Sequence, residues 1–255
     1  DSVAFFYRGE GRNVVWMGDF NGWGYHKNFD NRGKRIPNTD IWFLLASFPK
    51  DARLDYKIVV NETNWILDPH NSAHQWSGVG GGSPNSELRM PEWKEDPLTT
   101  SFVLNVHHGE LRKDLLFNSK ALGYQVTYTV YLPYGYQPGK VYPVIYVTDG
   151  YEYIHERMGN MITTLDNLIH MKKIQPVVAV FIDHREPVNR SNNRRMTELA
   201  MNEKYLNFLA EELMPVLERK YAVSKEASHR AILGTSMGGL SAAYFAFTKP
   251  DLFGL

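Results

Sequence analysis

The first ninety residues consist of short hydrophobic segments separated by polar turns. Each segment is rich in aromatic and β-branched residues, and clusters of Gly, Asn, Asp and Pro interrupt them at short, regular spacing. Such a pattern is typical of an all-β sandwich. The strands that it predicts are residues 3–7, 13–20, 41–48, 54–60 and 64–67.

After about residue 98 the pattern changes, and apolar segments alternate with amphipathic helical periodicity. Strands that alternate with helices indicate a mostly parallel sheet with helices on both of its faces. The alternation within residues 124–132 also favours an antiparallel hairpin at the start of this region. The predicted strands are 102–106, 124–132, 142–148, 176–182 and 231–233, and the predicted helices are 157–172, 205–221 and 240–247.

The two patterns meet at residues 90–97, which contain two prolines, are acidic and show no periodicity. We interpret this stretch as a linker between a β-sandwich over residues 1–92 and an α/β domain over residues 98–255. Gly78 to Gly82 form a glycine-rich loop that lacks the Lys-Ser/Thr pair and the helix of a phosphate-binding loop. We therefore expect it to be a plain connection.

Composition excludes several functional classes. Lys and Arg number 28, as do Asp and Glu, so no global charge favours nucleic acid or an anionic membrane, and neither is expected as a partner. The absence of cysteine removes disulfides, thiolate metal sites and a cysteine nucleophile, and we expect no metal and no cofactor. The sequence begins at Asp1 without a signal peptide, as a processed secreted protein or a trimmed chain would.

The segment Gly234-Thr235-Ser236-Met237-Gly238 fits the G-x-S-x-G nucleophile elbow, a tight turn between a strand and a helix. A serine forced to positive φ leaves room only for neighbours without a Cβ, which explains the glycines. The helix that follows directs free N–H groups and the positive end of its dipole at the serine. We predict that Ser236 is a nucleophile and that the Met237 N–H stabilises an oxyanion. The alternative is a Gly-Ser turn without chemistry.

A second oxyanion donor is expected from the loop after an earlier strand of the sheet. The backbone N–H of Tyr151 is our candidate, with Gly150 permitting the close approach of the chain. Where a G-x-S-x-G elbow carries the nucleophile, the catalytic acid and then the histidine follow it along the chain. After Ser236 the sequence holds one acid, Asp251, in a position typical of a helix cap, and no histidine. The triad acid and histidine are therefore expected beyond Leu255, in a chain truncated after the elbow helix.

The polar segment 183–195 follows a predicted strand and contains four arginines. Arg194 and Arg195 are candidates for charge-assisted hydrogen bonds to an anionic or phenolic substrate, and His184 is a candidate for the pocket wall. Gly150 is a further candidate for substrate binding. To serve as the base, His184 would have to break the chain order of the fold. The alternative for the arginines is pairing with nearby glutamates in a solvated loop.

The first ninety residues resemble the glycogen-binding type of carbohydrate-binding module (family 48), whose domains are immunoglobulin-like. The resemblance rests on Val-Trp-Met-Gly-Asp-Phe-Asn-Gly-Trp at 15–23, Tyr-Lys at 56–57 and Asn-Trp-Ile-Leu-Asp-Pro at 64–69. It implies glycan contacts at Trp23, Lys57, Trp65 and Asn85, and aromatic faces do suit the apolar faces of sugar rings. The alternative is that the tryptophans fill the core and the domain is only structural.

Residues 98–255 are similar to an esterase group of the α/β-hydrolases that includes enterochelin esterases and feruloyl and acetyl-xylan esterases. The matching stretches are Val-Tyr-Leu-Pro at 130–133, Pro-Val-Ile-Tyr-Val-Thr-Asp-Gly at 143–150, Gly-Thr-Ser-Met-Gly-Gly at 234–239 and the block 194–215. The resemblance implies an α/β-hydrolase fold and a serine carboxylic-ester hydrolase that works through an acyl-enzyme.

Together the two resemblances favour removal of feruloyl or acetyl groups from plant polysaccharide such as xylan. The partner would then be an acylated polysaccharide or oligosaccharide, and the protein would be secreted or periplasmic. A siderophore esterase, which would be cytoplasmic, is the second expectation. A glycan-binding protein with an inactive hydrolase scaffold is a third expectation, from a different class.

Overall fold

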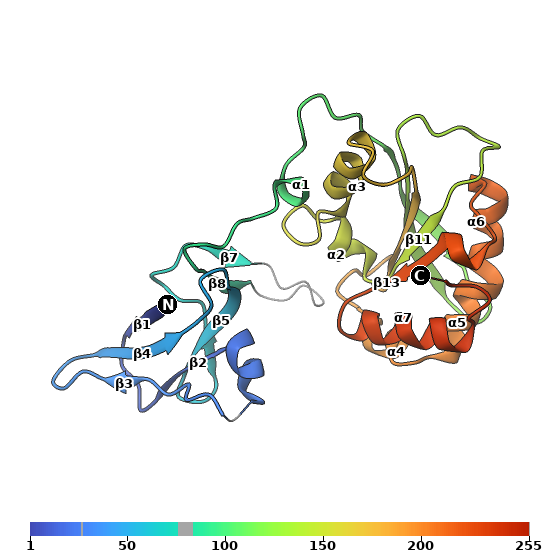
Figure 1. Ribbon diagram of the computed structural model, residues 1–255. Helices are drawn as coiled ribbons and strands as arrows, with labels where there is room; N and C mark the ends of the chain where they lie inside the picture. The colour runs from blue at the N-terminus through green and yellow to red at the C-terminus, as the bar shows by residue number, and fades with distance from the viewer. Residues whose placement is uncertain (27, 76–83, 255) are drawn as a thin grey trace. The chain divides into compact units, whose positions relative to one another are not determined.

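A computed structural model describes residues 1–26, 28–75 and 84–254, and the chain divides into two compact units, 1–95 and 96–255 (Figure 1). The division falls within the proline-containing stretch 90–97. The predicted glycine-rich loop, Gly78 to Gly82, lies outside the described residues. No helix in the described part of the chain is long and apolar enough to cross a membrane.

The first unit contains two antiparallel sheets around one core. Aromatic and aliphatic side chains from both sheets are buried between them, among them Phe5 and Leu44 from one sheet and Trp16 and Ile58 from the other. The five predicted strands are confirmed, whereas β3, β7 and β8 were not predicted; the immunoglobulin-like topology stays a prediction. The sheets are β1 (Ser2–Arg8), β4 (Ile41–Ser47) and β3 (Lys34–Arg35), and β2 (Val14–Gly18), β5 (Arg53–Val60), β8 (Asn85–Arg89) and β7 (His74–Gln75), with β6 (Asn64–Ile66) on β5.

The second unit is built on one sheet with the strand order β13-β11-β12-β10-β9. The strands β11, β12 and β13 are parallel, and β10 is antiparallel to both β12 and β9. The expectation of a mostly parallel sheet was therefore wrong in part, and the sheet is mixed. A short turn joins β9 to β10 and permits only antiparallel pairing of these two strands, which is the hairpin that the alternation within residues 124–132 predicted. The bounds are β9 (Glu110–Asn118), β10 (Gln125–Leu132), β11 (Val144–Val147), β12 (Val178–Asp183) and β13 (Arg230–Leu233).

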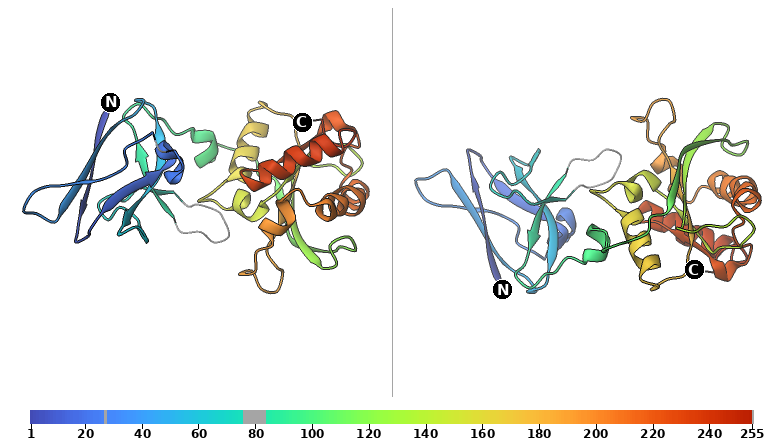
Figure 2. Two further views of the ribbon diagram at one scale, coloured as in Figure 1. Left: turned by 90° about the horizontal axis from the view of Figure 1, so that it is seen from below. Right: turned by 90° about the horizontal axis from the view of Figure 1, so that it is seen from above.

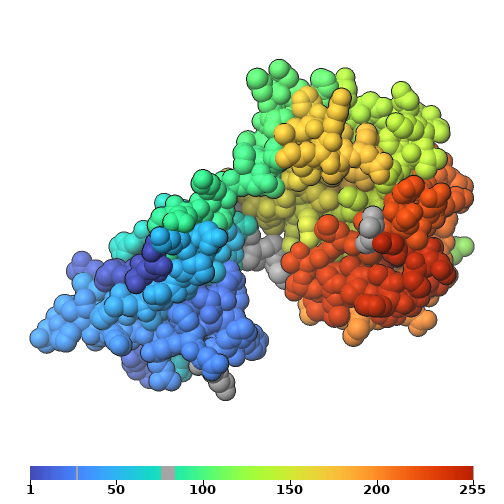
Figure 3. Space-filling view, in the orientation of Figure 1, coloured from blue at the N-terminus to red at the C-terminus, as the bar shows by residue number. Residues whose placement is uncertain are grey.

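Helices cover both faces of this sheet, as the sequence predicted (Figures 1 and 2). Alternate residues of β10 show the two layers, since Val130 packs in the core beneath α5 and α6 whereas Tyr131 packs in the core beneath α2 and α3. The helices are α1 (Pro97–Thr100), α2 (Gly150–Ile154), α3 (Met161–His170), α4 (Arg195–Leu199), α5 (Glu203–Asn207), α6 (Met214–Tyr221) and α7 (Met237–Thr248). The outward side of α7, red in Figure 3, carries the exposed side chains of Leu240 and Phe247.

Two predicted elements were wrong in detail. Residues 102–106 form no strand, and Leu104 is 86% exposed. The predicted helix 205–221 is interrupted by the π-helical segment η2 (Phe208–Leu213), which ends just before Pro215. Because proline has no N–H to donate, the regular α-helical ladder is broken there.

Candidate active site

The turn after β13 has the strained backbone of a nucleophile elbow. Ser236 adopts φ 58° and ψ −120°, and α7 begins at the next residue. A Cβ at Gly238 would overlap the Thr148 hydroxyl and lie 3.0 Å from an Asp149 carboxylate oxygen, and one at Gly234 would also overlap that hydroxyl. The two glycines are therefore required by close packing against the end of β11, and the serine is held in a conformation that few residues adopt.

The loop after β11 lies beside this turn. The strands β11 and β13 run parallel with Val147 opposite Leu233, and the Thr148 N–H donates to the Leu233 carbonyl over 3.0 Å. The carboxyl ends of both strands therefore meet at one edge of the sheet, where α2 begins at Gly150 and α7 begins at Met237. Within the described residues neither the Tyr151 N–H nor the Met237 N–H has a hydrogen-bond partner. Two such free donors are what an oxyanion site needs.

A buried ion pair connects the two loops. The Arg195 Nε donates to Asp149 Oδ1 over 2.7 Å, and its Nη2 donates to the Thr235 carbonyl over 3.1 Å. The Tyr153 hydroxyl lies 2.7 Å from the Thr235 Oγ1, which adds a second link between the loops. Both members of the Arg195–Asp149 pair are more than 90% buried.

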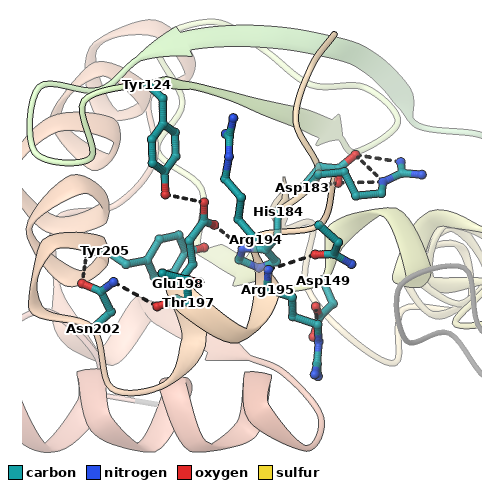
Figure 4. A network of polar contacts seen from close by, with 12 residues as sticks. Tyr124, Asp149, Asp183, His184, Arg194, Arg195, Thr197, Glu198, Asn202 and Tyr205 are labelled. Carbon is teal, nitrogen blue, oxygen red and sulfur yellow. Dashed lines mark hydrogen bonds and ion pairs between the residues drawn. The ribbon is translucent and has the colours of Figure 1, made fainter. Parts of the chain in front are cut away.

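His184 belongs to a buried network of polar side chains (Figure 4). Its Nδ1 lies 2.5 Å from Glu198 Oε2, and the Tyr124 hydroxyl donates to Glu198 Oε1 over 2.7 Å. Burial, followed by the charge of Glu198, raises the pKa of Tyr124 above its usual range, so the phenol stays neutral and donates. The His184 Nε2 is buried without a hydrogen-bond partner among the described residues, and in this arrangement it is therefore not bonded to Ser236.

The arginines of segment 183–195 are engaged with protein groups. The Arg194 guanidinium lies over the Tyr124 ring, 4.0 Å from its centroid, and donates to the Gln125 carbonyl. Arg185 and Arg190 both pair with Asp183. Substrate contacts by Arg194, Arg195 and His184 stay a prediction, although their polar groups are largely occupied here.

A pocket of about 180 Å³ lies beside the Tyr151 loop. Its wall includes the predicted Gly150 and Tyr151 but not His184, Arg194 or Arg195. Several of its residues were not predicted, although the alternating threonines of β10 were a usable signal because they place two hydroxyl groups on one face of the sheet. The lining residues are Lys113, Asp114, Thr127, Thr129, Gly150, Tyr151, Ile154, His155, Phe181, Asp183 and Arg185.

In the first unit, three of the four predicted glycan contacts share one face of a sheet. Lys57 lies on β5, with Met17 of β2 opposite it on one side and the position of Asn85 on β8 on the other. Trp65 of β6 lies opposite Val59, which is two residues after Lys57 on β5. Residues directly opposite in antiparallel strands point to the same face, here the one away from the core. Trp65 is 46% exposed, so it does not fill the core, whereas Asn85 is buried.

The fourth predicted contact, Trp23, follows β2 in the short 3-10 helix η1 (Asp19–Gly24). It has φ 57°, and its indole N–H donates to Asp19 Oδ1 over 3.1 Å. Trp16 and Trp42, by contrast, are buried in the core, as expected if these tryptophans serve the fold and do not contact glycan.

Comparison with known proteins identifies the class. Residues 119–255, more than half of the chain, match the family model described as "Putative esterase". The chain therefore belongs to this esterase family, and the relatives' names place the family among the carboxylic-ester hydrolases.

Particular relatives divide between two substrates. An endo-1,4-beta-xylanase/feruloyl esterase of Xylanibacter ruminicola is 29% identical over 232 residues, which cover 86% of this chain and 30% of that protein. The iron(III) enterobactin esterase of Escherichia coli K12 is 27% identical over 254 residues, which cover 90% of this chain and 60% of that protein. The chain thus spans less than two-thirds of the length of either relative.

Among solved structures, ferric enterobactin esterase from Salmonella typhimurium is similar with a TM-score of 0.74 and 22% identity. The match covers 99% of this chain and 70% of that one. At this level of identity the likeness is one of fold.

Proposed function

We propose that the protein is a serine carboxylic-ester hydrolase that works through an acyl-enzyme. The observation that carries the proposal is the strained turn at Ser236, which lies beside two N–H groups without partners in the described chain. Strain at such a position persists only where the surroundings impose it, and it is common at active sites. Family membership supports the same reaction class.

In the proposed reaction the Ser236 Oγ attacks the ester carbonyl, whose oxygen becomes an oxyanion held by the Met237 and Tyr151 N–H groups. A histidine takes the serine proton and passes it to the leaving alkoxide, so that an alcohol departs and an acyl-serine remains. Water then attacks the acyl-serine by the same steps in reverse and releases the acid. We place this histidine and the acid that orients it beyond Leu255, and the acyl group in the pocket next to Tyr151.

For the substrate, we propose feruloyl or acetyl groups on plant polysaccharide, with a secreted or periplasmic location. The relative named as a xylanase/feruloyl esterase supports this choice. A second candidate is a siderophore ester, with a cytoplasmic location, and the support for it is the 27% identity to the iron(III) enterobactin esterase of Escherichia coli K12 over 90% of this chain. Comparing the turnover of methyl ferulate with that of ferric enterobactin by the full-length protein separates the two candidate substrates. If the protein hydrolyses neither compound and no chromogenic acyl ester, only a glycan-binding protein with an inactive hydrolase scaffold remains.

We also propose that the first unit binds the polysaccharide, through the sheet face that carries Lys57 and Trp65. Trp65→Ala is expected to weaken binding to soluble xylan roughly tenfold, because the exposed indole offers a flat apolar surface to a sugar ring. Affinity electrophoresis measures the effect. Phe6→Ala is a matched control, since Phe6 is a similarly exposed aromatic residue on β1 of the other sheet. Equal retention of the wild type and both variants would contradict glycan binding at this face.

A further inference from the structure

One guanidinium touches both loops that carry the proposed oxyanion donors. Arg195 bonds the Asp149 carboxylate, two residues before Tyr151, and the Thr235 carbonyl, directly before Ser236. The Arg195 side chain is only 7% exposed. The link therefore lies inside the protein, behind the surface that a substrate would meet.

Arginine is suited to this link because its planar fork presents several donors in fixed directions. Here one N–H points to a carboxylate in the loop after β11 and another points to a carbonyl in the loop after β13. The single ammonium of a lysine has no such fork and would hold the two acceptors in a less defined geometry. The pair is also costly to bury, so its presence between these loops needs a reason other than stability alone.

The backbone that Arg195 holds is strained on both sides. Asp149 adopts φ 53° and ψ 37°, in the left-handed region, and Ser236 adopts φ 58°. Such conformations cost about 1–3 kcal/mol each and persist only where neighbouring groups determine them. Arg195 supplies one such determinant to each loop.

We propose that Arg195 is a positioning residue that fixes the separation of the Tyr151 and Met237 N–H groups, and that it does not contact the substrate. The proposal rests on the proposed esterase function, since it assigns both N–H groups to one oxyanion. It also replaces the expectation, drawn from the sequence, that this arginine binds the substrate.

The kinetic test uses the full-length protein and an activated acetyl ester. Arg195→Met is expected to lower kcat about 100-fold, the loss typical of one oxyanion donor, with KM changed by less than about threefold. Arg195→Lys keeps the charge beside Asp149 and should recover part of kcat. A rise in KM at unchanged kcat would show a substrate contact instead, and a lower Tm at unchanged kcat and KM would show support of the fold alone; either result overturns the proposal.

A matched control is available at the opposite end of β13. Arg230 is equally buried, and it likewise donates to a carbonyl, that of Ser224, and to a carboxylate, that of Glu218. Arg230→Met should therefore lower Tm about as much as Arg195→Met does, while kcat of the folded protein stays at the wild-type value. An equal fall of kcat in both variants would attribute the loss to the removal of any buried arginine and overturn the proposal.

A second measurement needs no turnover and keeps this proposal separate from the proposed function. If the wild type hydrolyses no ester, the proposed function fails, and hydrogen–deuterium exchange still tests the link. Arg195→Met should speed exchange in peptides that contain Tyr151 and in peptides that contain Met237, and Arg230→Met should not. Faster exchange confined to α4 would mean that Arg195 does not hold the two loops.

Discussion

Replacing Ser236 by alanine in the full-length protein is expected to lower kcat for an activated ester by about four to six orders of magnitude. The remaining rate would come from the oxyanion donors and substrate binding, which do not need the nucleophile. Steady-state assays with a chromogenic ester measure the loss, and circular dichroism checks that the fold is kept. Ser228→Ala, at an exposed serine in the same unit, is the control and should leave kcat unchanged. A Ser236→Ala protein with wild-type turnover would exclude the elbow as the reaction centre.

Replacing Gly238 by alanine is expected to disrupt the same turn through packing. The added Cβ would overlap the Thr148 hydroxyl, and overpacking of this kind costs about 1–3 kcal/mol, more than the gain of at most about 1 kcal/mol from alanine in a helix. The free energy of unfolding should therefore fall, and kcat should fall with it because Ser236 and Met237 are displaced. Chemical denaturation and esterase assays on the same samples measure the two effects.

The neighbouring glycine provides the control for this effect. At Gly239 the nearest atom to an added Cβ is the Gly234 carbonyl oxygen at 3.2 Å, a tight contact without overlap, so Gly239→Ala should cost less stability than Gly238→Ala. Adding Thr148→Ala to Gly238→Ala removes the overlapping hydroxyl and should recover part of the stability. If Gly238→Ala were as stable and as active as Gly239→Ala, the close packing of the turn against β11 would be contradicted.

The strained turn was predictable from the sequence because its requirements are local. A serine at positive φ needs small neighbours, and the apolar strand before it and the helix after it are read from adjacent residues. The Arg195–Asp149 pair was not predictable, since the partners are 46 positions apart and only the sheet brings them together. The charged loop is visible in the sequence, but the acid that pairs with each arginine is not.

Two predictions about strands were wrong because strand pairing, which the sequence pattern does not show, decided the outcome. The strand β9 was missed because a register shift opposite Tyr128 and Val130 interrupts its alternation, and because Asp114 within it adopts φ 51°. Such a bulge inserts an extra residue and moves the following side chains to the other face. The segment 102–106 was predicted as a strand from its apolar residues, yet among the described residues no strand pairs with it, and hydrophobicity alone does not supply a partner.

Covalent trapping of the nucleophile tests the role of Ser236 most directly. The full-length protein is treated with an alkyl fluorophosphonate, digested, and analysed by mass spectrometry in parallel with its esterase activity. We expect one phosphonyl adduct, on the peptide that contains Ser236, formed in step with the loss of activity and absent from Ser236→Ala. An adduct on another residue that accompanies full inactivation, or full inactivation of turnover without modification of Ser236, would contradict this role.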